Sequence, residues 1–233
     1  MQNPVLVILT SQILSVAMLI NPVAAESAPS LDFGAMVVGI ASDEEVIVAG
    51  VPLTSGTWGT DYITVSHALG VGPKYGLVRD GYARATAKPV AACSAQFHNI
   101  DVLILRVSTH PNTAVVEWGD PTGLNSGDEL VIFPRREFYP RPVTLRFVHL
   151  DLREWTISEP LVWSSEFRHV MVADGYSKPG FSGSPWVRQG KVYGLHKGSV
   201  RPQGQARWFA VAETATNVSQ CLKLIHYEDL IPK

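Results

Sequence analysis

The residues best suited to chemistry are one histidine, one aspartate and one serine, which follow one another along the chain. His67 lies near the end of the β-prone run 61–69, Asp101 opens an apolar run, and Ser182 lies within Gly-Phe-Ser-Gly-Ser-Pro at 180–185. A serine hydroxyl is a weak nucleophile unless a base removes its proton and a third group orients that base. The three side chains are therefore the set needed for acyl transfer to a serine.

The turn around Ser182 has the backbone that such chemistry requires. Gly180 and Gly183 can adopt positive φ and let a substrate approach the main chain, and Pro185 ends the turn. The amides of Gly180 and Ser182 could then point together at a developing oxyanion. Taken alone, the motif is also compatible with a solvent-exposed turn between two strands.

Asp61 and Asp80 are rival partners for the histidine. Asp80 precedes a glycine, which is typical of a turn. Asp61 lies six residues before His67, too far along one strand to face it. Asp101 has the better context because an apolar strand begins there. The resulting order His, Asp, Ser is that of chymotrypsin, whereas α/β-hydrolases and subtilisins use other orders.

These segments resemble the motifs of trypsin-like (chymotrypsin-fold) serine peptidases over roughly residues 35–226. The quoted matches are Thr64–Ala68 for the histidine motif, Asn99–Leu105 for the aspartate motif and Gly180–Pro185 for the serine motif. The chain looks closest to the glutamyl-endopeptidase-like and viral branches, which often follow the serine motif with glycine, an aliphatic residue and histidine, here Gly194–His196. The resemblance implies an all-β fold: two antiparallel six-stranded β-barrels with a C-terminal helix.

The resemblance also implies a role for each residue of the triad. Ser182 would attack the scissile carbonyl, His67 would accept and return the proton, and Asp101 would hold the imidazole tautomer. Phe181 stands where zymogen-activated relatives carry an aspartate that pairs with a new N-terminal amine. We therefore expect no activation through that ion pair. This departure leaves a second hypothesis open, a catalytically impaired protease-like binding module whose oxyanion turn is misformed.

Substrate choice follows from the same resemblance, which places Ser177, His196 and Gly198 in the pocket for the residue before the scissile bond (P1). In glutamyl endopeptidases and several viral relatives, a histidine at the position of His196 binds a P1 Glu or Gln. An imidazole can donate a hydrogen bond to either side-chain oxygen. Tyr176 occupies the place of the trypsin pocket aspartate, and Asp174 lies two residues earlier. Arg or Lys specificity is therefore not expected.

Composition is ordinary for a globular protein with a substantial core: 233 residues, 46% hydrophobic and 17% charged, with a net charge of −2. Basic residues are dispersed and mixed with acids, so no nucleic-acid-binding stripe is predicted. Lys178 and Lys197 would add positive potential near the predicted pocket. We expect a polypeptide substrate and a monomer.

Other chemistries are disfavoured by the motifs. The histidines lack metal-site spacing and there is no glycine-rich phosphate loop, so neither a metal nor a cofactor is predicted. An α/β-hydrolase esterase would need an acid and then a histidine after Ser182, and only Glu213 and His226 would serve.

Short β-prone runs between turn signals are typical of barrels and sandwiches. We expect one barrel over 31–120, another over 121–213 and a helix over 214–226, capped by Thr214 or Thr216. The loop-like break at 118–123 is the best domain boundary. The predicted strands are 35–42, 45–51, 61–65, 75–83, 85–93, 101–107, 129–133, 143–150, 154–157, 168–172, 184–188, 191–195 and 207–212.

The first 25 residues contain no charged side chain, and small residues at 23–25 would suit a signal peptidase. We predict a secretory signal cleaved after Ala25, although its start lacks Lys or Arg. The protein would then be secreted or periplasmic, with no stable membrane association after cleavage. An uncleaved anchor and a buried strand or helix are the alternatives.

In an exported chain Cys93 and Cys221 could join, and two buried free thiols are equally compatible with the sequence.

Overall fold

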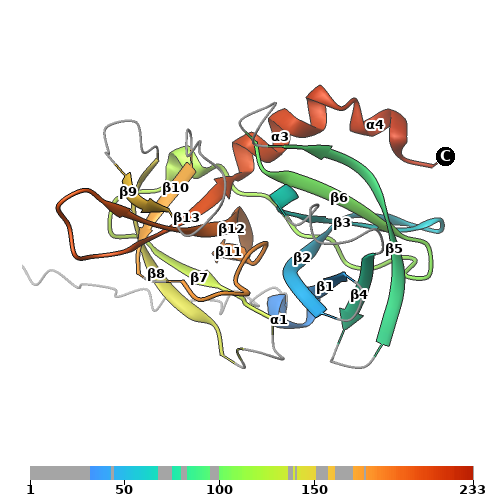
Figure 1. Ribbon diagram of the computed structural model, residues 1–233. Helices are drawn as coiled ribbons and strands as arrows, with labels where there is room; N and C mark the ends of the chain where they lie inside the picture. The colour runs from blue at the N-terminus through green and yellow to red at the C-terminus, as the bar shows by residue number, and fades with distance from the viewer. Residues whose placement is uncertain are drawn as a thin grey trace, which may run out of the picture. The chain divides into compact units, whose positions relative to one another are not determined.

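Antiparallel strands build both halves of the described chain (Figure 1). The computed structural model describes residues 32–42, 45–67, 75–79, 83–94, 100–135, 139, 141–150, 157–160, 170–175 and 177–232. The predicted signal segment 1–25, Asp80 and Tyr176 lie outside these residues. Leu31–Lys233 forms one compact unit. None of the helices in the described ranges is long and apolar enough to cross a membrane.

The first barrel closes in the order β1-β2-β3-β6-β5-β4, with all neighbours antiparallel. Its interior is filled mainly by aliphatic side chains, and β3 and β6 are buried along almost their whole length. The strands are β1 (Val38–Ser42), β2 (Glu45–Gly56), β3 (Gly59–Thr64), β4 (Tyr75–Arg79), β5 (Ala83–Cys93) and β6 (Val102–Val107).

The second barrel is a ring of six strands, β11-β7-β8-β10-β13-β12, which the pairing of β11 with β12 closes. A further strand, β9, pairs with β12 at its edge. The all-β, two-barrel fold predicted from the sequence is thus confirmed. The strands are β7 (Glu129–Ile132), β8 (Val143–Leu150), β9 (Ile157–Pro160), β10 (Val170–Asp174), β11 (Pro185–Arg188), β12 (Lys191–Pro202) and β13 (Phe209–Thr214).

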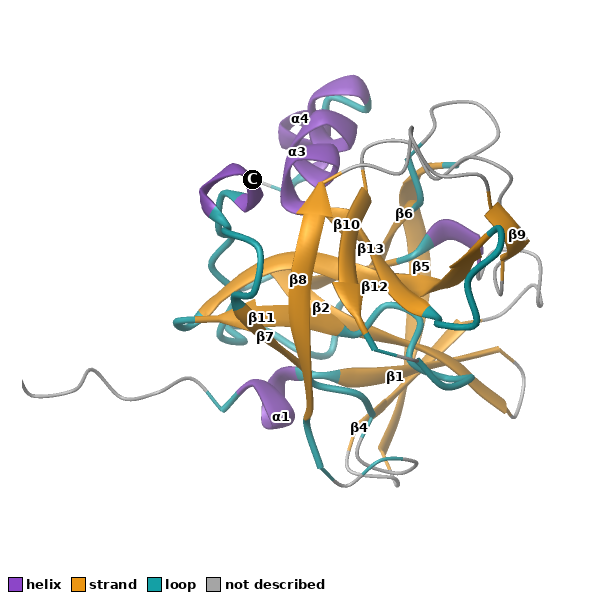
Figure 2. Ribbon diagram, turned by 90° about the vertical axis from the view of Figure 1, so that its left-hand side faces the viewer, coloured by secondary structure: helices purple, strands orange, loops and turns teal. Residues whose placement is uncertain are grey.

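Few helices accompany the strands (Figure 2). Within the described ranges they include α1 (Phe33–Met36), the 3₁₀ turn η2 (Pro121–Gly123), α3 (Ala215–Leu224) and α4 (Tyr227–Leu230). The strand predicted from residue 35 begins only at Val38, because the Asp32 side chain accepts from the Ala35 amide and caps a helical turn. Thr214 caps α3 by accepting from the Asn217 amide, and Thr216 does not.

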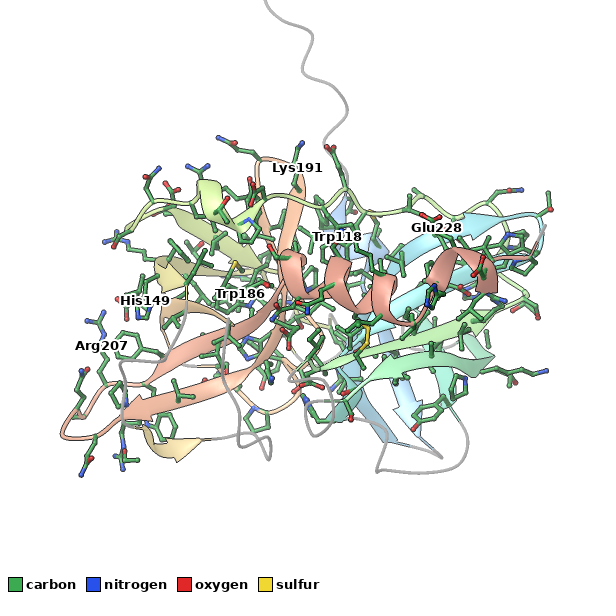
Figure 3. All side chains as sticks on the ribbon, turned by 90° about the horizontal axis from the view of Figure 1, so that it is seen from above. Trp118, His149, Trp186, Lys191, Arg207 and Glu228 are labelled. Carbon is green, nitrogen blue, oxygen red and sulfur yellow. A yellow bond between two sulfur atoms is a disulfide. The ribbon has the colours of Figure 1, made fainter. Side chains whose placement is uncertain are left out.

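The C-terminal helices lie over the first barrel, where Figure 1 shows α3 and α4 passing above β6 and β5. A disulfide joins Cys93 on β5 to Cys221 on α3 (Figure 3). Tyr227 donates from its hydroxyl to Asp61 at 2.7 Å, and Asp61 also accepts two hydrogen bonds from Arg106. The rival acid Asp61 therefore anchors a helix.

Candidate active site

His67 and Asp101 meet because β3 and β6 are neighbours in the first barrel. Their antiparallel ladder pairs Thr64 with Leu103. Continuing this register by two residues places Ser66 opposite Asp101, with His67 just beyond it. Asp101 Oδ2 lies 2.7 Å from His67 Nδ1. The local pairing of two strands thus assembles the base with its acid.

Asp101 is fully buried and saturated with donors. Its Oδ1 accepts from the Ser66 hydroxyl at 2.7 Å and from the His67 amide at 2.8 Å. Burial alone would raise the pKa of the Asp101 carboxyl, but the hydrogen bond from His67 and the charges of His67 and Lys197 lower it well below its usual value. The aspartate is therefore ionised across the physiological range, as a group that orients an imidazole must be.

Ser182 reaches the histidine from the second barrel. Its Oγ lies 3.1 Å from His67 Nε2. The serine turn is fixed on both sides, since the Gly183 amide donates to the His196 carbonyl at 2.8 Å and the Ala49 amide of β2 donates to the Ser182 carbonyl at 2.7 Å. Gly183 has φ 78°, and a Cβ there would overlap the Ala49 carbonyl oxygen. Only glycine allows this close approach of the barrels.

The predicted oxyanion donors, the amides of Gly180 and Ser182, have no acceptor among the described residues. The Pro179 carbonyl accepts from the Tyr139 hydroxyl at 3.3 Å. A trans peptide group directs its C=O and N–H to opposite sides, so this contact fixes which way the Gly180 N–H points. The contact therefore holds the peptide group between Pro179 and Gly180 in one orientation.

Phe181 is buried and packs against aromatic rings. Its ring meets Tyr139 edge to face, with centroids 4.6 Å apart. The guanidinium of buried Arg135 lies beside Gly180. The oxyanion turn is therefore supported by the segment after β7, a contact that the sequence did not indicate.

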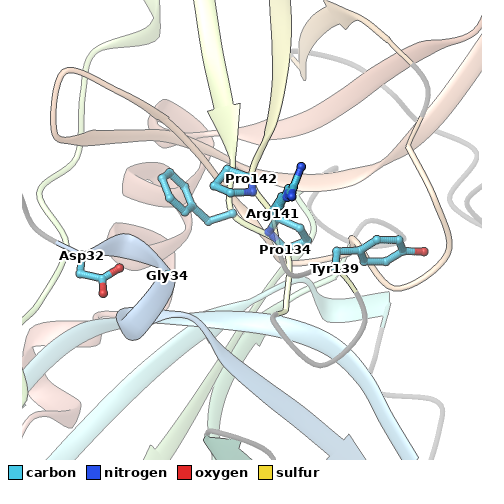
Figure 4. A pocket seen from close by; sticks show the side chains of 7 residues that line it. Asp32, Gly34, Pro134, Tyr139, Arg141 and Pro142 are labelled. Carbon is cyan, nitrogen blue, oxygen red and sulfur yellow. The ribbon is translucent and has the colours of Figure 1, made fainter.

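That segment also lines a cavity of about 300 Å³ beside the turn. Figure 4 shows Asp32 and Gly34 on one side of it, with Pro134 and Tyr139 on the other.

No group of His, Cys, Asp and Glu in the described ranges could hold a metal ion.

The predicted pocket residues all lie on or beside β12. Ser177 Oγ is 2.5 Å from Ser199 Oγ, and its amide donates to the same hydroxyl. Gly198 follows a β-bulge in β12 and pairs with β13. Asp174, which was set aside from the sequence as a pocket acid, forms an ion pair with Arg207.

His196 is fully buried, and its Nδ1 lies 3.2 Å from the indole nitrogen of Trp186. An indole N–H only donates, so Nδ1 must accept. Burial, and secondarily the charge of His67, lowers the pKa of His196 to about 3. The neutral ring therefore carries its proton on Nε2, which has no hydrogen-bond partner in the described part of the chain.

Two further charged groups form a buried pair that the sequence did not predict. Lys197 and Glu213 are both fully buried, and their Nζ and Oε2 atoms are 3.4 Å apart. Lys197, expected to lend positive potential to the pocket, is paired inside the second barrel instead. Glu213 comes directly after the predicted strand 207–212, and only the docking of the barrels reveals that it accepts from the Asp101 amide.

No family model matches the chain, and no curated protein matches it by sequence. Solved structures do. The protease Rv3671c from M. tuberculosis H37Rv, in an inactive mutant form, has a TM-score of 0.61 at 18% identity, covering 94% of this chain and 98% of that one. The MamO protease domain from Magnetospirillum magneticum gives 0.59 at 18% identity, covering 81% and 96%. The HtrA-type protease AlgW with a tripeptide gives 0.56 at 14% identity, covering 83% and 60%.

At these identities the similarity shows a shared chymotrypsin-like fold. The predicted closeness to the glutamyl-endopeptidase-like and viral branches stays a prediction.

Proposed function

We propose that this chain is a serine endopeptidase. One observation carries the proposal: a continuous contact from Ser182 Oγ to His67 Nε2 at 3.1 Å and from His67 Nδ1 to Asp101 Oδ2 at 2.7 Å. The two unengaged amides at Gly180 and Ser182 support it, because they face no competing acceptor among the described residues. The fold shared with known proteases is consistent with this chemistry.

The proposed reaction has two halves. Ser182 Oγ bonds to the scissile carbonyl carbon while its proton passes to His67 Nε2, and the amides of Gly180 and Ser182 bind the oxyanion. The C–N bond then breaks as His67 protonates the leaving amine. A water molecule attacks the acyl-enzyme, His67 takes its proton, and Ser182 is released with that proton restored. Asp101 stays ionised throughout and stabilises the imidazolium.

Labelling by a fluorophosphonate tests the proposal, because this reagent bonds only to an activated serine. We expect the wild-type protein to label and to cleave unfolded protein substrates, and Ser182→Ala and His67→Ala to do neither while remaining folded. Ser184→Ala is the matched control, since Ser184 belongs to the same motif but is fully buried. A wild-type protein that neither labels nor cleaves would favour the binding-module hypothesis.

For the substrate, we propose a P1 side chain that ends in a carboxamide or carboxyl, with Gln preferred over ionised Glu. The Nε2–H of His196 is a buried donor without a partner among the described residues, and a side-chain oxygen would complete it. The ring cannot readily become an imidazolium, because Trp186 donates to Nδ1. A single neutral donor can offset the desolvation cost of a neutral amide, but it offsets only part of the much larger desolvation cost of a carboxylate.

Peptides that differ only at P1 test this preference. We expect kcat/KM to fall in the order Gln, Glu, Leu at neutral pH, and the gap between Gln and Glu to narrow in acid, where the substrate carboxyl is protonated. His196→Leu should remove the preference for Gln and for Glu over Leu at P1. Cleavage after Arg or a large aromatic residue would contradict the role given to His196.

We further propose that the protein is exported. The disulfide between Cys93 and Cys221 is the kind of bond that persists in oxidising compartments, and it agrees with a signal in residues 1–25. Sequencing of the mature N-terminus after expression in a secreting host should give a chain that starts at Glu26. A mature protein that still begins at Met1 would contradict cleavage.

A further inference from the structure

Beneath the triad lies a second carboxylate that the proposed mechanism does not use. Glu213, on β13 of the second barrel, accepts the main-chain N–H of Asp101 on its Oε2 at 2.9 Å. The two residues are 112 positions apart in sequence. The triad acid is therefore held at its backbone by a side chain from the opposite barrel, the one that also carries Ser182.

The three described donors around Glu213 all point at its two carboxylate oxygens. Lys197 donates from Nζ to Oε2, and the Asn217 side-chain amide of α3 donates to Oε1. With both oxygens engaged by donors, the contacts stabilise the carboxylate with Lys197 as its counter-charge. Burial, opposed by Lys197 and Asn217, raises the pKa of Glu213. Removing either Lys197 or Glu213 would leave the other as a lone buried charge, which is strongly destabilising.

A β-bulge places Lys197 in this arrangement. β12 pairs His196 with Ala212 and Gly198 with Val211, so Lys197 is the extra residue between them. A bulge re-aims a side chain. Here the result is an ammonium group, fully buried, whose charge reaches Asp101. The charged groups facing one another are thus Asp101, His67, Lys197 and Glu213, with neutral His196 adjacent on β12.

We propose that Glu213 is a positioning residue, which with Lys197 as its counter-charge fixes the main chain of Asp101 across the barrel interface and so aligns His67 with Ser182. This inference rests on the proposed peptidase function. A purely stabilising pair would affect folding alone. The proposed positioning role also predicts an effect on kcat and on the pH dependence of the reaction.

The main test compares two substitutions of one residue. Glu213→Gln keeps an oxygen acceptor for the Asp101 amide, provided that the Asn217 side-chain amide flips so that its oxygen accepts from the new Gln NH₂ group. Glu213→Ala removes the acceptor. We expect Glu213→Ala to lose at least tenfold in kcat with little change in KM, and Glu213→Gln to regain most of that loss. If Glu213→Ala does not fold, the charge-free pair Lys197→Met with Glu213→Leu takes its place, and kcat must still fall.

The pH profile supplies the second readout. Glu213→Gln leaves the Lys197 charge unbalanced near the triad, so protonation of the base becomes harder. The acidic limb of kcat/KM should move to lower pH, because an uncompensated positive charge near the triad opposes a second positive charge on the base. Adding Lys197→Met to Glu213→Gln removes both charges and should return the limb to its wild-type position.

Arg106→Met is the matched control. Like the test variant, it removes the counter-charge of a buried group, here Asp61, although Arg106 itself is partly exposed. Arg106 lies five residues from Asp101 along β6, or about 17 Å. It should lower stability and leave the normalised pH profile unchanged. If wild-type protein cleaves while Glu213→Ala and Glu213→Gln have equal kcat, or the acidic limb does not move, the inference is overturned. If wild-type protein neither cleaves nor labels, the proposed function itself fails.

Discussion

The two halves of the candidate site are built from opposite kinds of interaction. In the first barrel, Asp101 is a buried charge held by Ser66 and His67. In the second barrel, the serine turn is held by glycine conformation and ring packing, and His196 beside it is a buried imidazole that stays neutral. Asp101 must be charged to act, whereas the serine turn and His196 are held by groups that carry no charge.

This difference follows from the task of each half. A base must be oriented and its cationic form stabilised, which requires a fixed carboxylate. A nucleophile with its oxyanion site needs backbone amides in fixed directions, which require turn geometry more than charge. Substitutions that alter charge should therefore act mainly through the first half, and substitutions that alter shape mainly through the second.

The largest effect is expected from Asp101→Asn. An amide cannot stabilise the imidazolium and favours the wrong tautomer, so kcat should fall by about 10⁴-fold while the fold persists. Asp61→Asn is the control, because Asp61 is equally buried in the same barrel but belongs to the α4 anchor. It should lower the melting temperature and spare kcat. Equal loss of kcat in both variants would erase the distinction between them.

A change of shape without charge tests the second half. Gly183→Ala would drive a methyl group into the Ala49 carbonyl and displace the serine turn, which we expect to reduce kcat/KM by about 10²-fold, the cost of a displacement near 1 Å. Gly190→Ala has a similar positive φ but open space around it. It should cost about 1 kcal/mol of stability and leave kcat/KM unchanged. Steady-state kinetics with urea unfolding distinguish the two.

The neutral state of His196 predicts a pH dependence of stability. Because the folded pKa of about 3 lies below the unfolded value of 6.5, the unfolded chain binds the proton first. This contribution to stability is complete above pH 6.5 and is lost as the pH falls toward 3, by up to about 1.4 kcal/mol per pH unit.

His196→Gln, which can still accept from Trp186, should flatten the fall in the free energy of unfolding between pH 6.5 and pH 4. Urea titrations at several pH values measure it. Wild-type and variant curves that stay parallel would show that His196 is not held neutral.

The smallest effect is expected from a single hydroxyl. Tyr139→Phe keeps the ring contact with Phe181 but loses the bond to the Pro179 carbonyl, so the Gly180 N–H is no longer held in one direction. We expect kcat to fall about tenfold with KM unchanged, less than complete loss of an oxyanion donor. Tyr193→Phe, elsewhere in the second barrel, is the control and should be silent. An unaffected Tyr139→Phe would leave packing alone to support the turn.

Local pattern was sufficient to locate most strands and the residues proposed as a triad, but β2 and β12 run on to Gly56 and Pro202, beyond the predicted ends at 51 and 195. Apolar and β-branched runs between turn residues predict strands because period-two burial is a short-range property, and the serine turn is visible because glycine and proline act on neighbouring dihedrals. The errors were also local. The strand expected from residue 35 loses its start to a helical turn, since the Asp32 cap acts over three residues.

The sequence by itself determined an all-β chain with a histidine, an aspartate and a serine in a suggestive order. Tertiary structure alone decided that Cys93 pairs with Cys221, that Tyr139 supports the oxyanion turn, and that Lys197 and Glu213 lie beneath Asp101. The physical reason is range: strand register and barrel docking bring together groups more than a hundred residues apart, as with Asp101 and Glu213. Periodicity and propensity within a short window carry no information about which distant partner a buried charge will meet.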